Sequence, residues 1–249
     1  MKAKILFITF MLVFIASGFA VDLPFQFQKA PATPRVGTER GGVATIGLFA
    51  LGARMGEFDT SIYNFGITPM FSIWNNRFGL TGDVPTGYLV SSSSLFDQFS
   101  GFNSAQNING GVKVWQSPNA STLVAFLGAN NMLTVLNYEA AGASGTLLVV
   151  VNGVQLGLRS DLRVSEILTI TPFYIYTVQG SSVSGTLDSM GTSVDIDSST
   201  GFGDITSSTL GFDVEIYDYS LAAMLSVADS ETWTFSLSFT VLSMPINQG

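Results

Sequence analysis

The sequence predicts an all-β fold: an antiparallel transmembrane β-barrel of about ten strands, with twelve strands as the alternative. Three observations predict it: segments in which apolar and polar side chains alternate, a low content of charge, and an alternation of short and long links between the segments. Charged residues are 11% of the 249-residue chain, against ~25% in ordinary soluble domains. A secreted soluble β-sandwich would also have alternating strands, but so little charge disfavours it.

The clearest alternation lies at the C-terminal end of the chain. Five apolar side chains fall on one face of a single extended segment: Trp233, Phe235, Leu237, Phe239 and Val241. The residues between them are all Ser or Thr. The segments Ser220–Val227 and Thr209–Ile216 repeat the pattern, and the links between the three segments are short. Three consecutive segments of this kind predict an antiparallel meander, and Val154–Arg163 and Phe78–Val84 repeat the alternation earlier in the chain.

The lengths of the links predict how the barrel is oriented. Counting from a first strand near Gly42–Arg54, short links fall at Asn75-Asn76, Ser117–Ala120, Arg163–Glu166 and Tyr217–Tyr219. Long links fall at Thr86–Asn109 and Val178–Thr206. Outer-membrane barrels keep both termini and their short turns in the periplasm and their longer loops outside. The alternation therefore predicts an outer-membrane barrel with two long external loops.

Two segments decide the strand count. If residues 121–138 and 145–162 are each one long strand, the barrel has ten strands. If Gly128–Asn131 and Asn152-Gly153 are hairpin turns, it has twelve. The shorter strands would fall below the ~9–11 residues that a tilted span needs, which favours ten. A third alternative is a short helix inside the lumen, with one face formed by Leu123, Phe126 and Leu127.

Two similar proline-containing segments occur in the chain, Ile67–Phe71 and Ile170–Tyr174. Proline has no backbone N–H to donate to a strand pair, and a closed barrel has no free edge on which to place it. Pro69 and Pro172 are therefore each expected at a bulge or at a strand end.

The N-terminal residues have the parts of a secretory signal: a basic start, a short apolar stretch and small residues before Val21. We expect residues 1–20 to be a signal peptide and 21–41 a flexible periplasmic lead-in, with a partner-binding or pore-plugging segment as its alternative. The barrel domain is expected at 42–242 and a C-terminal tail at 243–249. The expected partners are outer-membrane lipid, the barrel-assembly machinery during insertion and a small solute.

The residues that are absent exclude much chemistry. The chain has no histidine and no cysteine, the residues on which most hydrolytic triads, thiol nucleophiles and metal sites depend. We therefore expect no enzyme activity, no cofactor and no metal. Without residues 1–20 the chain has 8 basic and 18 acidic residues, and this acidity disfavours nucleic-acid binding.

Two motifs in the second half of the chain resemble functional motifs of other proteins. The segment Asp195–Gly201 alternates oxygen ligands like a calcium loop, but its glycine is one position late and no glutamate closes the site. A solvated surface loop is the better interpretation. The segment Gly201-Phe202-Gly203-Asp204-Ile205 resembles the Gly-x-Gly-Asp opening of a family of outer-membrane transporters in phenol-degradation pathways. This resemblance covers about five residues and implies a transport role.

Alternation also predicts which side chains line the lumen and which lie at the membrane interfaces. The charged residues expected to line the pore are Arg77, Asp83, Lys113, Arg159, Asp161, Arg163, Asp213 and Glu215. The aromatic residues expected at strand ends, where interfacial girdles form, are Tyr63, Trp74, Tyr88, Trp115, Tyr217, Tyr219 and Trp233. The expected function is a narrow pore or small-solute transporter. The alternative is a non-conducting structural or adhesive barrel with functional external loops.

Overall fold

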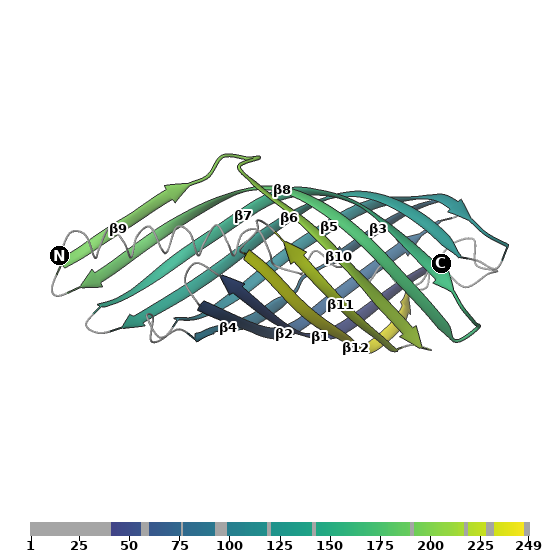
Figure 1. Cartoon of the computed structure of the whole chain (residues 1–249), viewed down its shortest axis with the longest axis horizontal. Coiled ribbons are helices and arrows are strands. Elements are labelled where there is room, and N and C mark those ends of the chain that lie inside the picture. Colours follow the sequence, from purple (N-terminus) through teal and green to yellow (C-terminus); the bar gives the residue numbers. More distant parts are fainter. Residues whose placement is uncertain are drawn as a thin grey trace.

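The structure is a computed structural model, and its described residues form strands and their connections (Figure 1). The described residues are 41–55, 60–75, 77–92, 99–118, 121–140, 143–189, 192–216, 219–227 and 232–246. The strands of the first half are β1 (Gly41–Met55), β2 (Thr60–Trp74), β3 (Phe78–Asp83), β4 (Thr86–Ser92), β5 (Phe99–Gln116) and β6 (Thr122–Ala140). Those of the second half are β7 (Ala143–Arg163), β8 (Leu168–Ser189), β9 (Thr192–Ser199), β10 (Ile205–Ile216), β11 (Tyr219–Val227) and β12 (Thr232–Ile246). In the part of the chain that is described, no helix is long and apolar enough to cross a membrane.

The sheet closes into an antiparallel barrel because β1 pairs with β2 on one side and with β12 on the other. Two positions in the wall are each shared by two strands. Both β3 and β4 lie between β2 and β5, and both β9 and β10 lie along the same edge of β8. The twelve strands of the described residues therefore occupy ten positions, and the ten-strand prediction is confirmed.

The alternatives for residues 121–162 are wrong. β6 and β7 are each one continuous strand, so neither Gly128–Asn131 nor Asn152-Gly153 is a turn, and Leu123, Phe126 and Leu127 lie on a strand and not on a helix. The side chains of Asn131 and Asn152 hydrogen-bond across the β6–β7 pair. Each of these strands has a partner along most of its length on both sides, and these ladders outweigh the local preference of Asn-Gly for a turn.

The register of the strands fixes their tilt. Paired residues can be followed from Leu147 on β7 through β6, β5, β4, β2, β1, β12, β11, β10 and β8. The row returns to β7 at Arg159, twelve residues from where it began. A displacement of this size in a ten-position barrel requires strands tilted by ~35–45° from the barrel axis. Figure 1 shows the strands running obliquely in this way.

The described residues that flank the predicted short links lie at one end of the barrel, which we call the turn end. Gly41 and Ile246, the first and last described residues, also lie there, because Gly41 pairs with Trp74 and Gly42 with Ile246. The two long loops are a wrong prediction. Most of Thr86–Asn109 belongs to β4 and β5, and most of Val178–Thr206 belongs to β8 and β9. A segment rich in Ser, Thr and Gly is typical of a loop, but in β8 and β9 such residues form two paired strands.

Neither of the two prolines ends a strand; each lies where the pairing with one neighbour is interrupted. Pro69 is opposite Ile46, beside the irregularity in β1, and faces the gap between β3 and β4 on its other side. Pro172 lies between Ile170 and Phe173, where the pairing of β8 with β7 is interrupted without a change of register. The missing N–H of each proline therefore falls where a ladder is already incomplete.

The glycine-rich segment before β10 is a turn that separates β9 from β10. Gly203 has φ of 100°, a left-handed conformation that glycine adopts without strain. The backbone N–H of Gly201 donates to the Asp204 carboxylate at 2.6 Å. The N–H of Gly203 donates to the Gln179 carbonyl of β8. The turn thus connects β9 to β10, and its hydrogen bond to Gln179 keeps the β8 backbone paired between these two strands.

The apolar side chains face outward in the half of the barrel nearer the turn end, which we call the lower barrel. On β10, β11 and β12 the predicted alternation holds residue by residue, with Leu210 65% exposed and Thr234 completely buried. β12 continues to Ile246, beyond the expected domain boundary at 242. Strand β1 begins at Gly41, and the expected signal peptide and nearly all of the lead-in lie outside the described residues.

The closure between β1 and β12 can be tested with a disulfide. Ala50 and Leu237 are paired across this seam and both face outward. Because the chain has no cysteine, the double variant Ala50→Cys/Leu237→Cys is expected to form one intramolecular cross-link on oxidation. The measurement is the altered gel mobility of the denatured, non-reduced protein. The control pair is Ala50→Cys/Leu225→Cys, on strands that are not neighbours; equal cross-linking of both pairs would contradict the closure.

Candidate functional site: the barrel interior

The inward-facing side chains of β7 change from apolar to amide to charged along the strand. We call the end opposite the turn end the far end. From the far end toward the turn end these residues are Leu147, Val149, Val151, Gly153, Gln155, Gly157, Arg159, Asp161 and Arg163. The neighbouring strands add residues of the same kinds, so that the interior has three layers. We call them the charged layer, the amide layer and the apolar layer.

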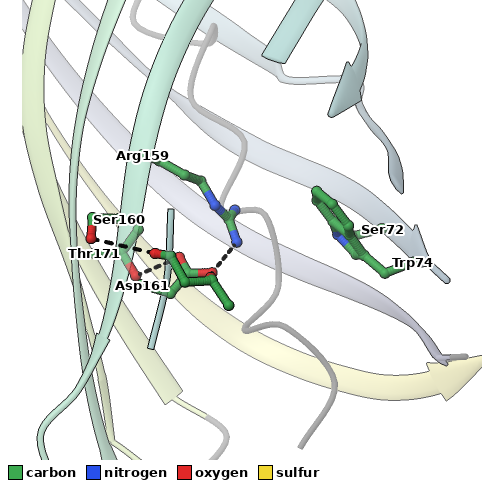
Figure 2. A network of polar contacts seen from close by, with 7 residues as sticks. Ser72, Trp74, Arg159, Ser160, Asp161 and Thr171 are labelled. Atoms are coloured by element: carbon green, nitrogen blue, oxygen red, sulfur yellow. Dashed lines mark hydrogen bonds and ion pairs between the residues drawn. The ribbon is translucent and has the colours of Figure 1, made fainter. Parts of the chain in front are cut away.

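The charged layer lies at the turn end. It comprises Lys113, Arg159, Asp161, Arg163, Asp213 and Glu215. The Arg159 guanidinium contacts the Asp161 carboxylate at 2.7 Å, and both side chains are about 95% buried. Asp161 also accepts hydrogen bonds from the hydroxyls of Thr122 and Thr171, each at 3.1 Å. Figure 2 shows this network on one side of the interior and Trp74 on the other.

Trp74 belongs to this layer and not to an interfacial girdle, which corrects its predicted position. It is 3% exposed, its indole N–H donates to Ser72 at 2.9 Å, and the Lys113 ammonium lies 5.5 Å from its ring centroid. A Cβ atom at Gly79 or Gly111 would collide with the indole ring. Gly79 on β3 and Gly111 on β5, which are paired with each other, therefore create the space that accepts Trp74 inside the barrel. Lys113 over the ring is a favourable cation–π contact.

The amide layer occupies the middle of the interior. It comprises Asn64, Asn103, Asn107, Asn109, Asn130, Gln155 and Gln179, with the Asp83 carboxylate among them. Three contacts connect it: Asn64 to Asn103 at 3.0 Å, Gln155 to Asn109 at 2.7 Å, and Asn107 to Asp83 at 2.5 Å. Several buried atoms of the layer have no protein partner, namely Asn64 Oδ1, Asn103 Nδ2, Asn130 Oδ1, Gln155 Oε1, Gln179 Oε1 and Asp83 Oδ2. Buried polar atoms of this kind need water or a ligand.

The apolar layer lies at the far end, where β6, β7, β8 and β9 extend beyond the other strands. Its members are buried: Leu136, Leu147, Val149, Val151, Val183, Leu187 and Ile196. On β8 and β9 the outward-facing residues of these extensions are polar: Ser182, Ser184, Thr186, Asp188, Ser193, Asp195 and Asp197. β8 has 22 residues, about twice what a tilted span needs. On β8 and β9 the polarity of the wall is thus inverted relative to the lower barrel, with polar residues outside and apolar residues inside.

This apolar layer was missed by the sequence reasoning, although the sequence contains a signal for it. Thr146–Val151 is apolar at both odd and even positions, so it cannot belong to a strand that is polar inside and apolar outside. The odd-numbered residues of this run, Leu147, Val149 and Val151, are the ones that face inward.

The structure distributes the other predicted residues as follows. Asp83, Lys113, Arg159, Asp161, Arg163, Asp213 and Glu215 lie on inward faces. Arg77 does not join them, because it is exposed in the turn between β2 and β3. Of the aromatic set, Tyr63, Tyr88, Trp115, Tyr219 and Trp233 are exposed on the outside. Tyr219 stacks on Phe239 with ring centroids 6.2 Å apart, and Tyr217 lies outside the described residues.

The aspartate-rich segment Asp195–Gly201 is mainly strand, which corrects its interpretation as a loop. Asp195 and Asp197 are exposed on β9. Within the described ranges no group of three or more His, Cys, Asp or Glu side chains could hold a metal ion.

The sequence matches no protein-family profile and no curated protein. The fold is similar to solved bacterial outer-membrane barrels. The outer membrane protease OmpT from Escherichia coli has a TM-score of 0.51 and 10% identity, covering 83% of this chain and 96% of its own. The translocator domain of the autotransporter NalP from Neisseria meningitidis has a TM-score of 0.47 and 14% identity, over 83% of this chain and 88% of its own. The outer membrane protein OprG from Pseudomonas aeruginosa has a TM-score of 0.45 and 12% identity, over 85% and 99%.

These similarities are in fold: the chain is a closed β-barrel like those of the bacterial outer membrane. The apolar outer surface of its lower barrel has the polarity that a lipid-facing wall requires.

The buried ion pair of the charged layer makes a stability prediction. Asp161→Asn leaves Arg159 without its carboxylate partner, and removing one member of a buried pair costs about 3 kcal/mol. We expect the free energy of unfolding in detergent, measured by urea titration, to fall by about that amount. The control is Glu166→Gln, which is exposed in the turn after β7 and is expected to change stability by less than about 0.5 kcal/mol. Equal effects of the two variants would show that the pair contributes nothing.

Proposed function

We propose that this barrel is a narrow pore for small solutes in the bacterial outer membrane, reached after signal-directed export. The observation that supports it best is the set of buried, inward-facing polar atoms without a protein partner. They occur on β2, β3, β5, β6, β7, β8, β10 (at Ser207) and β12. Polar atoms are rarely left without a partner inside a protein. Water filling the interior would hydrogen-bond them, and a continuous column of water is a path for solutes.

The charged layer would act as the selective part of this path. Its inward-facing charges, taken with Asp83, are nearly balanced, with Lys113, Arg159 and Arg163 against Asp83, Asp161, Asp213 and Glu215. Arg159 and Asp161 already neutralise each other. A solute passing the layer would therefore meet a weak net field, which favours uncharged solutes or small ions over strongly charged ones.

Transport is a better account of the interior than catalysis. One of the similar structures is a protease, but the likeness extends to fold alone. This chain has neither histidine nor cysteine, and the interior carboxylates Asp83 and Asp161 accept hydrogen bonds from Asn107 and from Thr122, Thr171 and Arg159. Side chains held in this way are typical of a structural network.

One feature favours the alternative, a barrel that conducts nothing and serves adhesion or envelope structure. The β8–β9 hairpin projects beyond the rest of the wall (Figure 1), with a polar and acidic outer face. A projecting hairpin is a surface on which a partner could bind. This alternative requires no open path through the interior.

Planar-bilayer recording separates the two functions. We expect single-channel conductance from the purified barrel, and in a KCl gradient we expect Arg163→Gln to shift the reversal potential toward cation preference, because it removes an inward positive charge. Arg77→Gln is the matched control, since Arg77 is an arginine at the same end that is exposed in a turn. Absence of conductance from the wild-type barrel would exclude the pore and favour the structural role.

A further inference from the structure

We propose that the apolar layer and the adjoining amide layer form one binding site for an uncharged amphipathic solute, with a compact alkyl or aryl body and a head group that donates a hydrogen bond. This inference rests on the proposed transport function for its purpose. The binding itself can be measured without transport.

The first argument is the inverted polarity of the wall. On β8 and β9 the inward residues Val183, Leu187 and Ile196 are at most 6% exposed, whereas the outward residues beside them are polar and exposed. A strand that only had to project into water would need no apolar inner face. Val183 is paired with Val149, and Leu147 with Leu136, so this inner face is continuous across three strands. It matches the lining of sites that bind apolar groups.

The second argument is that the unpartnered amide atoms lie directly beside this face. Gln179 is paired with Gly153, and the next inward pair on the same strands is Ser181 with Val151, followed by Val183 with Val149. The Gln179 side chain is therefore separated from the first apolar pair by a single inward position. Gln179 is 2% exposed and its Oε1 atom has no protein partner.

The unpartnered atoms also indicate the polarity of the head group. Five of the unpartnered atoms belong to amide side chains. Four of these are acceptor oxygens, on Asn64, Asn130, Gln155 and Gln179, and one is a donor nitrogen, on Asn103. A ligand that completes them must mainly donate, as a hydroxyl does. An anionic head is not matched, because the Asp83 carboxylate lies among these acceptors and the basic residues of the interior lie in the charged layer, where Arg159 is already paired with Asp161.

The chosen probes share one aromatic body and differ in the head: benzyl alcohol, toluene and benzoate. Equilibrium dialysis of the radiolabelled probes against the full-length chain in lipid nanodiscs, with empty nanodiscs as the blank, measures binding directly. We expect saturable binding of benzyl alcohol, about tenfold tighter than toluene for one added hydrogen bond, and no saturable binding of benzoate.

Two variants assign the two halves of the site. Val149→Ser is expected to weaken binding of both benzyl alcohol and toluene by about tenfold, while Leu148→Ser, which faces outward one position away, leaves both unchanged. Gln179→Leu is expected to weaken benzyl alcohol about tenfold and to spare toluene, while the outward-facing Gln106→Leu changes neither. Each variant is first checked for heat-modifiable migration, and Val149→Ala replaces Val149→Ser if the latter does not fold.

The outcomes are distinct from those of the pore. Wild-type binding no greater than that of empty nanodiscs would overturn the site and show the apolar layer to be a packed end of the barrel. Equal loss in Val149→Ser and Leu148→Ser, or equal affinity for benzyl alcohol and toluene, would also overturn it. Saturable, Gln179-dependent binding by a barrel that carries no current would support the site and exclude the proposed pore.

Discussion

The ladder between β1 and β12 is the constraint on which the rest of the structure depends. It runs from Gly42 opposite Ile246 to Met55 opposite Thr232 and joins the two ends of the described chain. In a bilayer an unpaired strand edge leaves its backbone groups without partners, at a cost of several kcal/mol each. Closure removes both edges at once. It also fixes the displacement of twelve residues around the wall, and with it the tilt that determines which side chains share a level inside.

Closure with this tilt explains why one strand carries three kinds of inner surface. The interior of a ten-position barrel lies between a barrel filled by its side chains and one that encloses a wide channel. In the charged layer, Trp74 and the Arg159–Asp161 pair occupy part of that space. In the amide layer, hydrogen bonds such as Asn64–Asn103, which joins β2 and β5 across β4, leave atoms unpartnered. Toward the far end, where the outer face of β8 and β9 is polar, the inner face becomes apolar at Val149 and Val183.

The sequence was sufficient to predict the features that depend on local periodicity. The ten positions, the short turns and the outward face of β10–β12 all follow from alternation within a strand, because lipid outside and polar groups inside impose a period of two. The length of the strands could not be predicted in this way. β8 and β9 contain many Ser, Thr and Gly residues, and only their pairing with a neighbour, a long-range property, makes them strands.

The interior was the least predictable part for the same physical reason. A period of two predicts on which face of a strand a residue lies, but not its height along the barrel. Trp74 was therefore predicted in an interfacial girdle, although it lies on the same inward face as the buried Ser72. Gly79 and Gly111, which make room for the indole, belong to other strands. Alternation predicts Arg77 in the lumen, but the turn between β2 and β3 determines its position. The apolar layer was hidden because its outward partners, such as Leu148, are also apolar.

The inversion of polarity along the wall is the central claim, and accessibility of a spin label along β8 tests it most directly. Single cysteines from 172 to 188 would be labelled with a nitroxide in the reconstituted barrel, and collisions with oxygen and with a water-soluble nickel complex would be measured. The account predicts high oxygen accessibility at Tyr174, Tyr176 and Val178, high nickel accessibility at Ser184 and Thr186, and low values of both at Val183 and Leu187. Oxygen accessibility that continued unchanged up to Thr186, or nickel accessibility at Val183 and Leu187, would contradict it.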